Sequence, residues 1–156
     1  MTLFFAGSFN PFTAGHADIV ERALRVADGV IIGVGVNAGK PGARAEAEAR
    51  CRDISALYAG NPRVSVTAYH GLTATAAAAM GATALLRGIR SVKDFEYERD
   101  MAQINRRLTG IETVLLFADP ALGAVSSSVV RELQGYGADV SAFLPRKAGD
   151  DGHKGK

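Results

Sequence analysis

The stretch that decides the fold of this chain is GSFNPFTAGH, residues Gly7 to His16. It follows the apolar run Leu3–Ala6, typical of a buried strand, and it precedes a helical pattern of apolar residues. A glycine-rich turn between a strand and a helix exposes backbone N–H groups at the positive end of the helix dipole, which suits a polyphosphate. His16 adds a donor or a cation at the same place. The same pattern is also typical of an ordinary turn whose small polar residues cap a helix.

A second block, RGIRSVKDFEYE, spans Arg87 to Glu98 and follows the apolar run of residues 82–86. Arg87 and Arg90 therefore stand at the carboxyl end of a buried strand, where parallel α/β folds bind ligands. The guanidinium fork matches phosphate oxygens in a bidentate way. The alternative is a solvated charged turn whose arginines pair with the neighbouring carboxylates of Asp94, Glu96 and Glu98.

A third block, VSSSVVREL, spans Val125 to Leu133 and places three serines ahead of an apolar helix. Serine is a favoured N-cap, and the start of a helix offers free amides to an anion. The block predicts either a ligand-binding helix start with free hydroxyls and amides or a plain N-cap without a ligand.

Strands and helices are expected to alternate along the chain, and this pattern favours a parallel sheet. Strands are predicted over residues 3–6, 30–36, 63–68, 82–86 and 113–118. Helices are predicted over residues 15–27, 45–59, 73–80, 92–108 and from 126 to 135 or 137, with a short helical turn at 139–143. The predicted fold is α/β, a doubly wound five-stranded parallel sheet with helices on both faces. It forms a single domain over residues 1–145, and the polar residues 146–156 are expected to be disordered.

Composition excludes several classes of protein. The chain has 156 residues, 47% of them hydrophobic, and a formal net charge of +2, which is too small to predict a nucleic-acid surface. The single cysteine, Cys51, excludes an intramolecular disulfide and has no metal-ligand spacing around it. No apolar run is long enough for a transmembrane helix, and no signal peptide is visible. We therefore expect a cytoplasmic protein without membrane contact and without a structural metal.

Together the three blocks resemble bacterial phosphopantetheine adenylyltransferases of the nucleotidylyltransferase superfamily. That family carries a GxFDPxTxGH turn, an RGxRxxxDFEYE segment and an xSSSxVRE helix start in this order. The likeness runs from about Leu3 to Pro145, and the second block is the most specific part of it. It implies a Rossmann-like fold and the transfer of AMP from ATP to 4′-phosphopantetheine, which gives dephospho-CoA and pyrophosphate.

The resemblance also implies a set of site residues. His16 is the expected catalytic group at the α-phosphate of ATP, and Lys40, Thr73 and Arg87 are expected to bind the acceptor. Ser8 is expected to contact both substrates. The remaining residues expected to bind ATP are Phe9, Gly88, Ile89, Arg90, Glu98, Leu122, Gly123, Ala124, Val125, Ser126, Ser127 and Ser128.

The family further implies magnesium arriving with ATP, CoA as an inhibitor that shares the pantetheine arm, and a homohexamer. This chain departs from the family pattern at Ser8, which stands where threonine is usual, and at Asn10, which replaces aspartate. Ala6 replaces a proline, and residues 42–49 lack the usual aromatic side chain.

Two other functions stay open from the sequence. The first is an adenylyltransferase for nicotinamide mononucleotide, whose turn shares the GSF triplet, although the second block argues against it. The second is a non-catalytic sensor of nucleotides or CoA. The presence of His16, Lys40, Arg87 and Arg90 together argues against a sensor.

Overall fold

The computed structural model describes residues 1–147, and the predicted tail lies outside the described residues except for its first two positions. The strands are β1 (Thr2–Gly7), β2 (Gly29–Gly35), β3 (Val64–Tyr69), β4 (Ala84–Ile89) and β5 (Glu112–Phe117). The helices are α1 (Ala14–Ala23), α2 (Ala43–Leu57), α3 (Thr73–Ala79), α4 (Val92–Thr109) and α5 (Ser127–Gly135). Short 3₁₀ turns cover Pro120–Leu122 and Ser141–Phe143. In the described part of the chain, no helix is long and apolar enough to cross a membrane.

The five strands form one sheet in the order β3-β2-β1-β4-β5, and every neighbouring pair is parallel. The chain starts at the central strand β1, moves outward through β2 and β3, and then returns to place β4 on the other side of β1. The strand order therefore reverses between β1 and β4, and ligands of doubly wound folds bind at this switch point. The predicted five-stranded, doubly wound sheet is confirmed.

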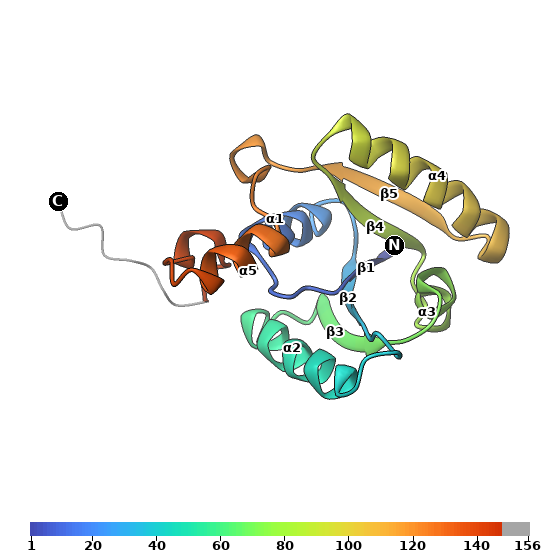
Figure 1. Ribbon diagram of the computed structural model, residues 1–156. Coiled ribbons are helices and arrows are strands. Elements are labelled where there is room, and N and C mark those ends of the chain that lie inside the picture. Colours follow the sequence, from blue (N-terminus) through green and yellow to red (C-terminus); the bar gives the residue numbers. More distant parts are fainter. Residues whose placement is uncertain (148–156) are drawn as a thin grey trace.

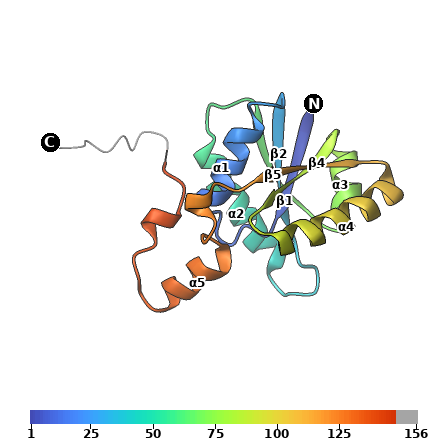
Figure 2. The ribbon, with the colours of Figure 1, turned by 90° about the horizontal axis from the view of Figure 1, so that it is seen from above.

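Helices cover both faces of the sheet, as the alternating pattern predicted (Figures 1 and 2). On one face, α1 and α2 contribute Ile19, Val20 and Ile54 to a core that includes Leu3 and Phe5 of β1. The side chains of β1 alternate, so its other residues point to the opposite face. There, Phe4 and Ala6 pack with Ala74 and Ala77 of α3 and with Leu85 of β4. Within the alanine-rich residues 74–79, Ala74 and Ala77 thus form a close-packed contact between a helix and the sheet.

Two predicted boundaries are wrong by three residues or more, because β4 runs on to Ile89 instead of ending at residue 86 and α1 ends at Ala23 and not near residue 27. The chain continues in tight turns, in which Arg25 and Val26 donate to carbonyls only three residues back. The guanidinium of Arg63, next to β3, donates to the carbonyl oxygens of Leu24, Ala27 and Asp28. A side chain almost forty residues away thus satisfies carbonyls at the end of this helical segment, which have no partner within the helix.

The hydroxyl of Tyr58, at the end of α2, is buried without a hydrogen-bond partner among residues 1–147. Burial raises the pKa of this hydroxyl, and its ring packs against Phe12. We expect Tyr58→Phe to leave the free energy of unfolding unchanged or to raise it by up to about 1 kcal/mol, because an unpaired polar atom is removed.

The matched control for this prediction is Tyr69→Phe. The hydroxyl of Tyr69 lies 2.8 Å from Oγ1 of Thr73, so its removal breaks a hydrogen bond and is expected to cost about 1 kcal/mol. Urea unfolding of the two variants beside the parent protein measures both changes. A loss for Tyr58→Phe as large as that for Tyr69→Phe would contradict the prediction.

Candidate active site

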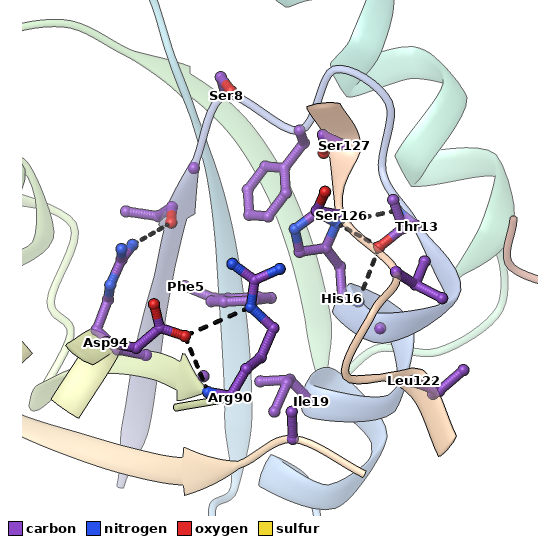
Figure 3. Close-up of a pocket in the computed structure, with 18 of the residues that line it drawn as sticks. Phe5, Ser8, Thr13, His16, Ile19, Arg90, Asp94, Leu122, Ser126 and Ser127 are labelled. Atoms are coloured by element: carbon purple, nitrogen blue, oxygen red, sulfur yellow. Dashed lines mark hydrogen bonds and ion pairs between the residues drawn. The ribbon is translucent and has the colours of Figure 1, made fainter. Parts of the chain in front are cut away.

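A cavity of about 440 Å³ lies at the switch point, where the carboxyl ends of β1 and β4 meet the first turns of α1 and α5. Figure 3 shows the ring of His16 and the guanidinium of Arg90 pointing into the same space from opposite walls. The lining residues come from all three sequence blocks: Phe5, Ala6, Gly7, Ser8, Phe9, Thr13, Gly15, His16, Ile19, Arg87, Gly88, Arg90, Asp94, Tyr97, Glu98, Ala118, Leu122, Val125, Ser126 and Ser127.

His16 is held at the start of α1 by a capping box that it forms with Thr13. The backbone N–H of Thr13 donates to Nδ1 of His16 at 2.9 Å, and Oγ1 of Thr13 lies 3.1 Å from the same nitrogen. Because Nδ1 accepts a hydrogen from the backbone, the proton of the neutral ring is carried by Nε2. The fold therefore selects the tautomer that presents an N–H donor on the ring edge away from Thr13.

Three phenylalanine rings surround the imidazole of His16. The ring centroids of Phe9, Phe12 and Phe5 lie 5.0, 5.3 and 6.1 Å from that of His16. Phe9 is buried and adopts a φ of +47°, a left-handed conformation that costs energy for a residue other than glycine. Its packing against Phe5, Phe12 and His16 holds it there. The strained turn thus places an apolar wall directly behind the histidine.

This environment keeps His16 neutral in the free protein. Burial, with a smaller contribution from the positive charges of Arg90 and Arg87, lowers the pKa of His16 from 6.5 to about 4. A neutral imidazole near pH 7 is a hydrogen-bond donor and carries no charge. Of the two roles left open by the sequence, the structure of the free protein thus favours the donor over the cation.

The lowered pKa predicts how the stability of the protein depends on pH. Above about pH 7, the histidine is neutral in both the folded and the unfolded chain. As the pH falls from 6.5 towards 4, only the unfolded chain takes up the proton, so the free energy of unfolding falls. Between pH 8 and pH 5 this linkage amounts to a loss on the order of 2 kcal/mol.

The measurement is urea unfolding at pH 8, 6, 5 and 4, beside the variant His16→Gln. Glutamine does not titrate, and at this helix position it can replace the histidine in the capping box. The other ionisable groups titrate in both proteins, so the difference between the two curves isolates His16. Parallel curves between pH 8 and 5 would show that the pKa of His16 is not lowered.

The two arginines of the second block are already held by carboxylates of α4. Nε and Nη2 of Arg87 donate to the buried Glu98 at 2.9 and 2.7 Å, and Nη1 donates to the carbonyl of Ala6 at 2.8 Å. Arg90 lies against Asp94, whose Oδ2 accepts the backbone N–H of Arg90 at 3.0 Å and faces Nε at 3.4 Å. The pairing that the sequence offered as an alternative is thus present, and it orients both guanidinium groups at the cavity wall.

The serines at the start of α5 differ from the prediction of free hydroxyls. Oγ of Ser126 caps the helix by accepting from the N–H of Val129 at 3.2 Å. Oγ of Ser127 donates to the carbonyl of Pro11 at 2.7 Å, and Oγ of Ser128 accepts from Arg131 at 3.3 Å. All three hydroxyls have protein partners, because the turn and the helix use them locally. The first amides of the helix remain to face an anion.

A second cavity, of about 260 Å³, adjoins the first on the opposite face of the sheet. The two share Ala6, Arg87, Tyr97 and Glu98 in their walls. The rest of its lining mixes apolar and polar side chains and comes from α3 and the loop before it, from α4 and from the neighbouring strands: Phe4, Gly71, Leu72, Thr73, Leu85, Met101, Ala102, Asn105 and Thr113. Thr73, expected on the acceptor side, lies here. Arg87 therefore stands on the boundary between the two cavities.

Most of the residues expected from the sequence line one of these cavities, but five do not. Lys40 is exposed and its Nζ lies 3.0 Å from a carboxylate oxygen of Glu46, so it does not reach either wall. The other four are Ile89, Gly123, Ala124 and Ser128. Their ligand contacts stay predictions, as do the individual roles of the residues that do line the walls.

Sequence reasoning did not place Asp94 and Tyr97 in the site, although both line the first cavity. They precede Glu98 on α4 by four residues and by one, and Asp94 and Tyr97 are three residues apart, a spacing that places both on the same side of the helix and could have signalled them. Met101 continues this row into the second cavity. The role of Thr13 in holding Nδ1 of His16 was not visible either, because it uses a backbone N–H.

The fold and the site define a class of protein. Nucleotidyltransferases typically have a parallel sheet with a phosphate-binding turn at its switch point. Their site typically adds a histidine donor and a pair of arginines. The family model for cytidylyltransferase-like proteins matches residues 4–133. A solved structure titled as a putative nicotinate-nucleotide adenylyltransferase from Vibrio parahaemolyticus superimposes with a TM-score of 0.61 over 93% of both chains, at 17% identity. At that identity the likeness supports the fold alone.

Curated relatives show to which family of nucleotidyltransferases the chain belongs. A phosphopantetheine adenylyltransferase from Porphyromonas gingivalis is 55% identical over 90% of this chain and 92% of its own length. Those from Bacteroides thetaiotaomicron and Cutibacterium acnes are 50% and 42% identical, and each comparison covers at least 90% of both proteins. The chain belongs to the phosphopantetheine adenylyltransferase family.

Proposed function

We propose that this enzyme transfers the adenylyl group of ATP to 4′-phosphopantetheine, giving dephospho-CoA and pyrophosphate, a step of coenzyme A biosynthesis. The observation that carries the proposal is the pair of adjoining cavities with Arg87 on their shared wall. ATP fits the first cavity, between the first turn and the start of α5, where His16 and Arg90 face each other. The acceptor fits the second cavity, where Thr73 lies, with its phosphate at the shared wall beside Arg87, so that this phosphate can face the α-phosphate of ATP.

In the proposed reaction, an oxygen of the acceptor phosphate attacks the α-phosphorus of ATP in line. A new phosphorus–oxygen bond forms, the bond from the α-phosphorus to the bridging oxygen breaks, and pyrophosphate leaves with the electron pair. A phosphate oxygen is already ionised at pH 7, so the step requires no general base. The protein contributes by holding two polyanions in line and by stabilising the charge that develops around the α-phosphorus.

Each part of the first cavity has a role in this scheme. The Nε2–H of His16 donates to a non-bridging oxygen of the α-phosphate, and Arg90 neutralises the charge of the leaving pyrophosphate. The amides at the start of α5 bind the terminal phosphates. Glu98 orients Arg87 towards the acceptor phosphate, because it holds the Nε side of the guanidinium. Lys40 joins the acceptor phosphate by leaving Glu46.

The substrate is ATP with bound magnesium. In residues 1–147, no three His, Cys, Asp or Glu side chains are grouped to hold a metal, and the two carboxylates of the first cavity are paired with arginines. We therefore propose that magnesium enters on the phosphates of ATP, which it neutralises.

Three further properties are proposed from the family resemblance. CoA competes for the acceptor site because it shares the pantetheine arm. The chain forms a homohexamer, for which the exposed apolar residues Phe95, Ile104 and Leu108 of α4 offer a surface to cover. The enzyme works in the cytoplasm, and no nucleic acid or membrane is among its partners.

The test measures pyrophosphate release from magnesium and ATP with 4′-phosphopantetheine, with nicotinamide mononucleotide, and without an acceptor. Release with 4′-phosphopantetheine alone supports the proposal. Release with nicotinamide mononucleotide alone would assign the chain to the other adenylyltransferase. ATP binding without any release would favour a sensor, with Asn10 and residues 42–49 as the first changes to revert.

A further inference from the structure

The turn that carries the site, residues 8–12, depends on side chains of two helices for its hydrogen bonds. Asn10 and Pro11 form a local turn, and among the described residues no backbone hydrogen bond joins residues 8–12 to another segment of the chain. Three of its carbonyl oxygens instead accept from side chains. Nη1 of Arg50 on α2 donates to Ser8 at 3.2 Å, Nη1 of Arg131 on α5 donates to Asn10, and Oγ of Ser127 donates to Pro11. In Figure 1 the blue turn runs between these two helices.

Arg50 is itself held in place on α2. Its Nη2 lies 3.2 Å from Oε2 of Glu46, one helical turn earlier, while Nη1 reaches the carbonyl of Ser8. Its side chain is 21% exposed, compared with 79% for Arg44 on the same helix. One terminal nitrogen of this guanidinium thus binds its own helix, and the other binds the turn. A planar, rigid fork suits such a bridge better than the single ammonium of lysine.

Arg131 forms the corresponding bridge from the other side. Its Nη2 donates to Oγ of Ser128 at 3.3 Å, and its Nη1 donates to the turn. The helix that presents its first amides to the cavity is therefore tied to the segment that carries His16. Neither Arg50 nor Arg131 lines either cavity, so neither is placed to touch a substrate.

We propose that Arg50 and Arg131 are positioning residues that hold the 8–12 turn from opposite sides and so set the position of Ser8 and His16 for catalysis. The inference rests on the proposed function for its kinetic part only. Because the two residues act on the carbonyls of Ser8 and Asn10 in one short turn, the loss of either releases much of what the other holds.

The test compares Arg50→Ala and Arg131→Ala with Arg44→Ala. Arg44 has a similar ion pair, with Glu48 one turn away, but no contact with the turn. We expect kcat to fall roughly 10- to 100-fold in the two test variants, since small displacements of catalytic groups cost that much, while KM for the acceptor changes little. Arg44→Ala is expected to match the parent. Millimolar guanidinium should restore part of the activity of Arg50→Ala, and the double variant should lose less than the product of the two single losses.

A second measurement, which does not require enzyme activity, tests the positioning role independently of the proposed function. Hydrogen–deuterium exchange of residues 8–16 is expected to speed up in Arg50→Ala and Arg131→Ala but not in Arg44→Ala. If the parent protein releases no pyrophosphate with 4′-phosphopantetheine, the proposed function fails and the exchange data alone decide the positioning role. Exchange and kcat that match Arg44→Ala would overturn the inference. If an alanine variant does not fold, Arg50→Lys and Arg131→Lys replace it, with the same expected acceleration of exchange.

Discussion

Replacing His16 by alanine is expected to lower kcat about 10²- to 10³-fold, which is the usual loss when one preorganised donor to a developing oxyanion is removed. The capping box with Thr13 fixes Nδ1 as an acceptor and leaves the proton on Nε2, so the donor is aimed before the substrate arrives. Binding of ATP relies mainly on Arg90 and the amides of α5 in the proposed scheme. We therefore expect KM for ATP to change by much less than kcat.

The control for this experiment is His16→Gln. Its side-chain carbonyl can accept the N–H of Thr13, which keeps the helix start intact, and its amide leaves a neutral donor near the position of Nε2. We expect this variant to retain more activity than the alanine variant. Steady-state kinetics with both substrates varied provides kcat and both KM values. A rise in KM for ATP with unchanged kcat would assign His16 to binding in place of the transition state.

The sequence predicted the order of all strands and helices, because each element carries a strong local signal. The apolar run of β1, the Gly-Asn-Pro stop after α2 and the glycine after α4 are local features. What it missed depends on contacts between distant residues. Arg63 joins the turns after α1 to β3, and its hydrogen bonds to Leu24 and Ala27 could not be predicted from the local pattern.

In the site, too, local motifs could be predicted from the sequence, whereas contacts between distant residues could not. The three motifs identified the turn, the arginine pair and the start of α5, since each has a distinct residue spacing. The partners that occupy those groups were not visible, because hydrogen bonds from Ser127 and Arg131 to the turn join residues more than a hundred positions apart. The position of Lys40 away from both cavities reflects its pair with Glu46, six residues later, which competes with any ligand.

The second large effect is expected from Glu98→Ala. Glu98 is buried at 7% exposure and accepts two hydrogen bonds from Arg87, whose side chain is 36% exposed. Among the described residues, removal of the carboxylate leaves a partly buried guanidinium with only the carbonyl of Ala6 as a partner. Breaking a fully buried pair costs about 3–5 kcal/mol, and because water can reach Arg87 we expect a loss of about 2 kcal/mol in the free energy of unfolding.

The kinetic consequence follows from the position of Arg87 between the two cavities. Without Glu98 the guanidinium is free to rotate, so we expect KM for the acceptor to rise roughly tenfold, an effect on the scale of one lost charge-assisted hydrogen bond. Glu96→Ala on the same helix is the matched control, because it removes the same charge from an exposed position. Urea unfolding and acceptor kinetics of the two variants measure both effects.

Glu98→Gln separates geometry from charge. Its carbonyl oxygen can still accept from Nε or Nη2 of Arg87, so the guanidinium keeps its orientation while the pair loses its negative charge. If orientation is what the acceptor requires, this variant retains a KM near that of the parent and loses only stability. If KM for the acceptor rises as far as in Glu98→Ala, binding of the acceptor depends on the negative charge of Glu98. The role of the carboxylate is then more than to hold Arg87 in place.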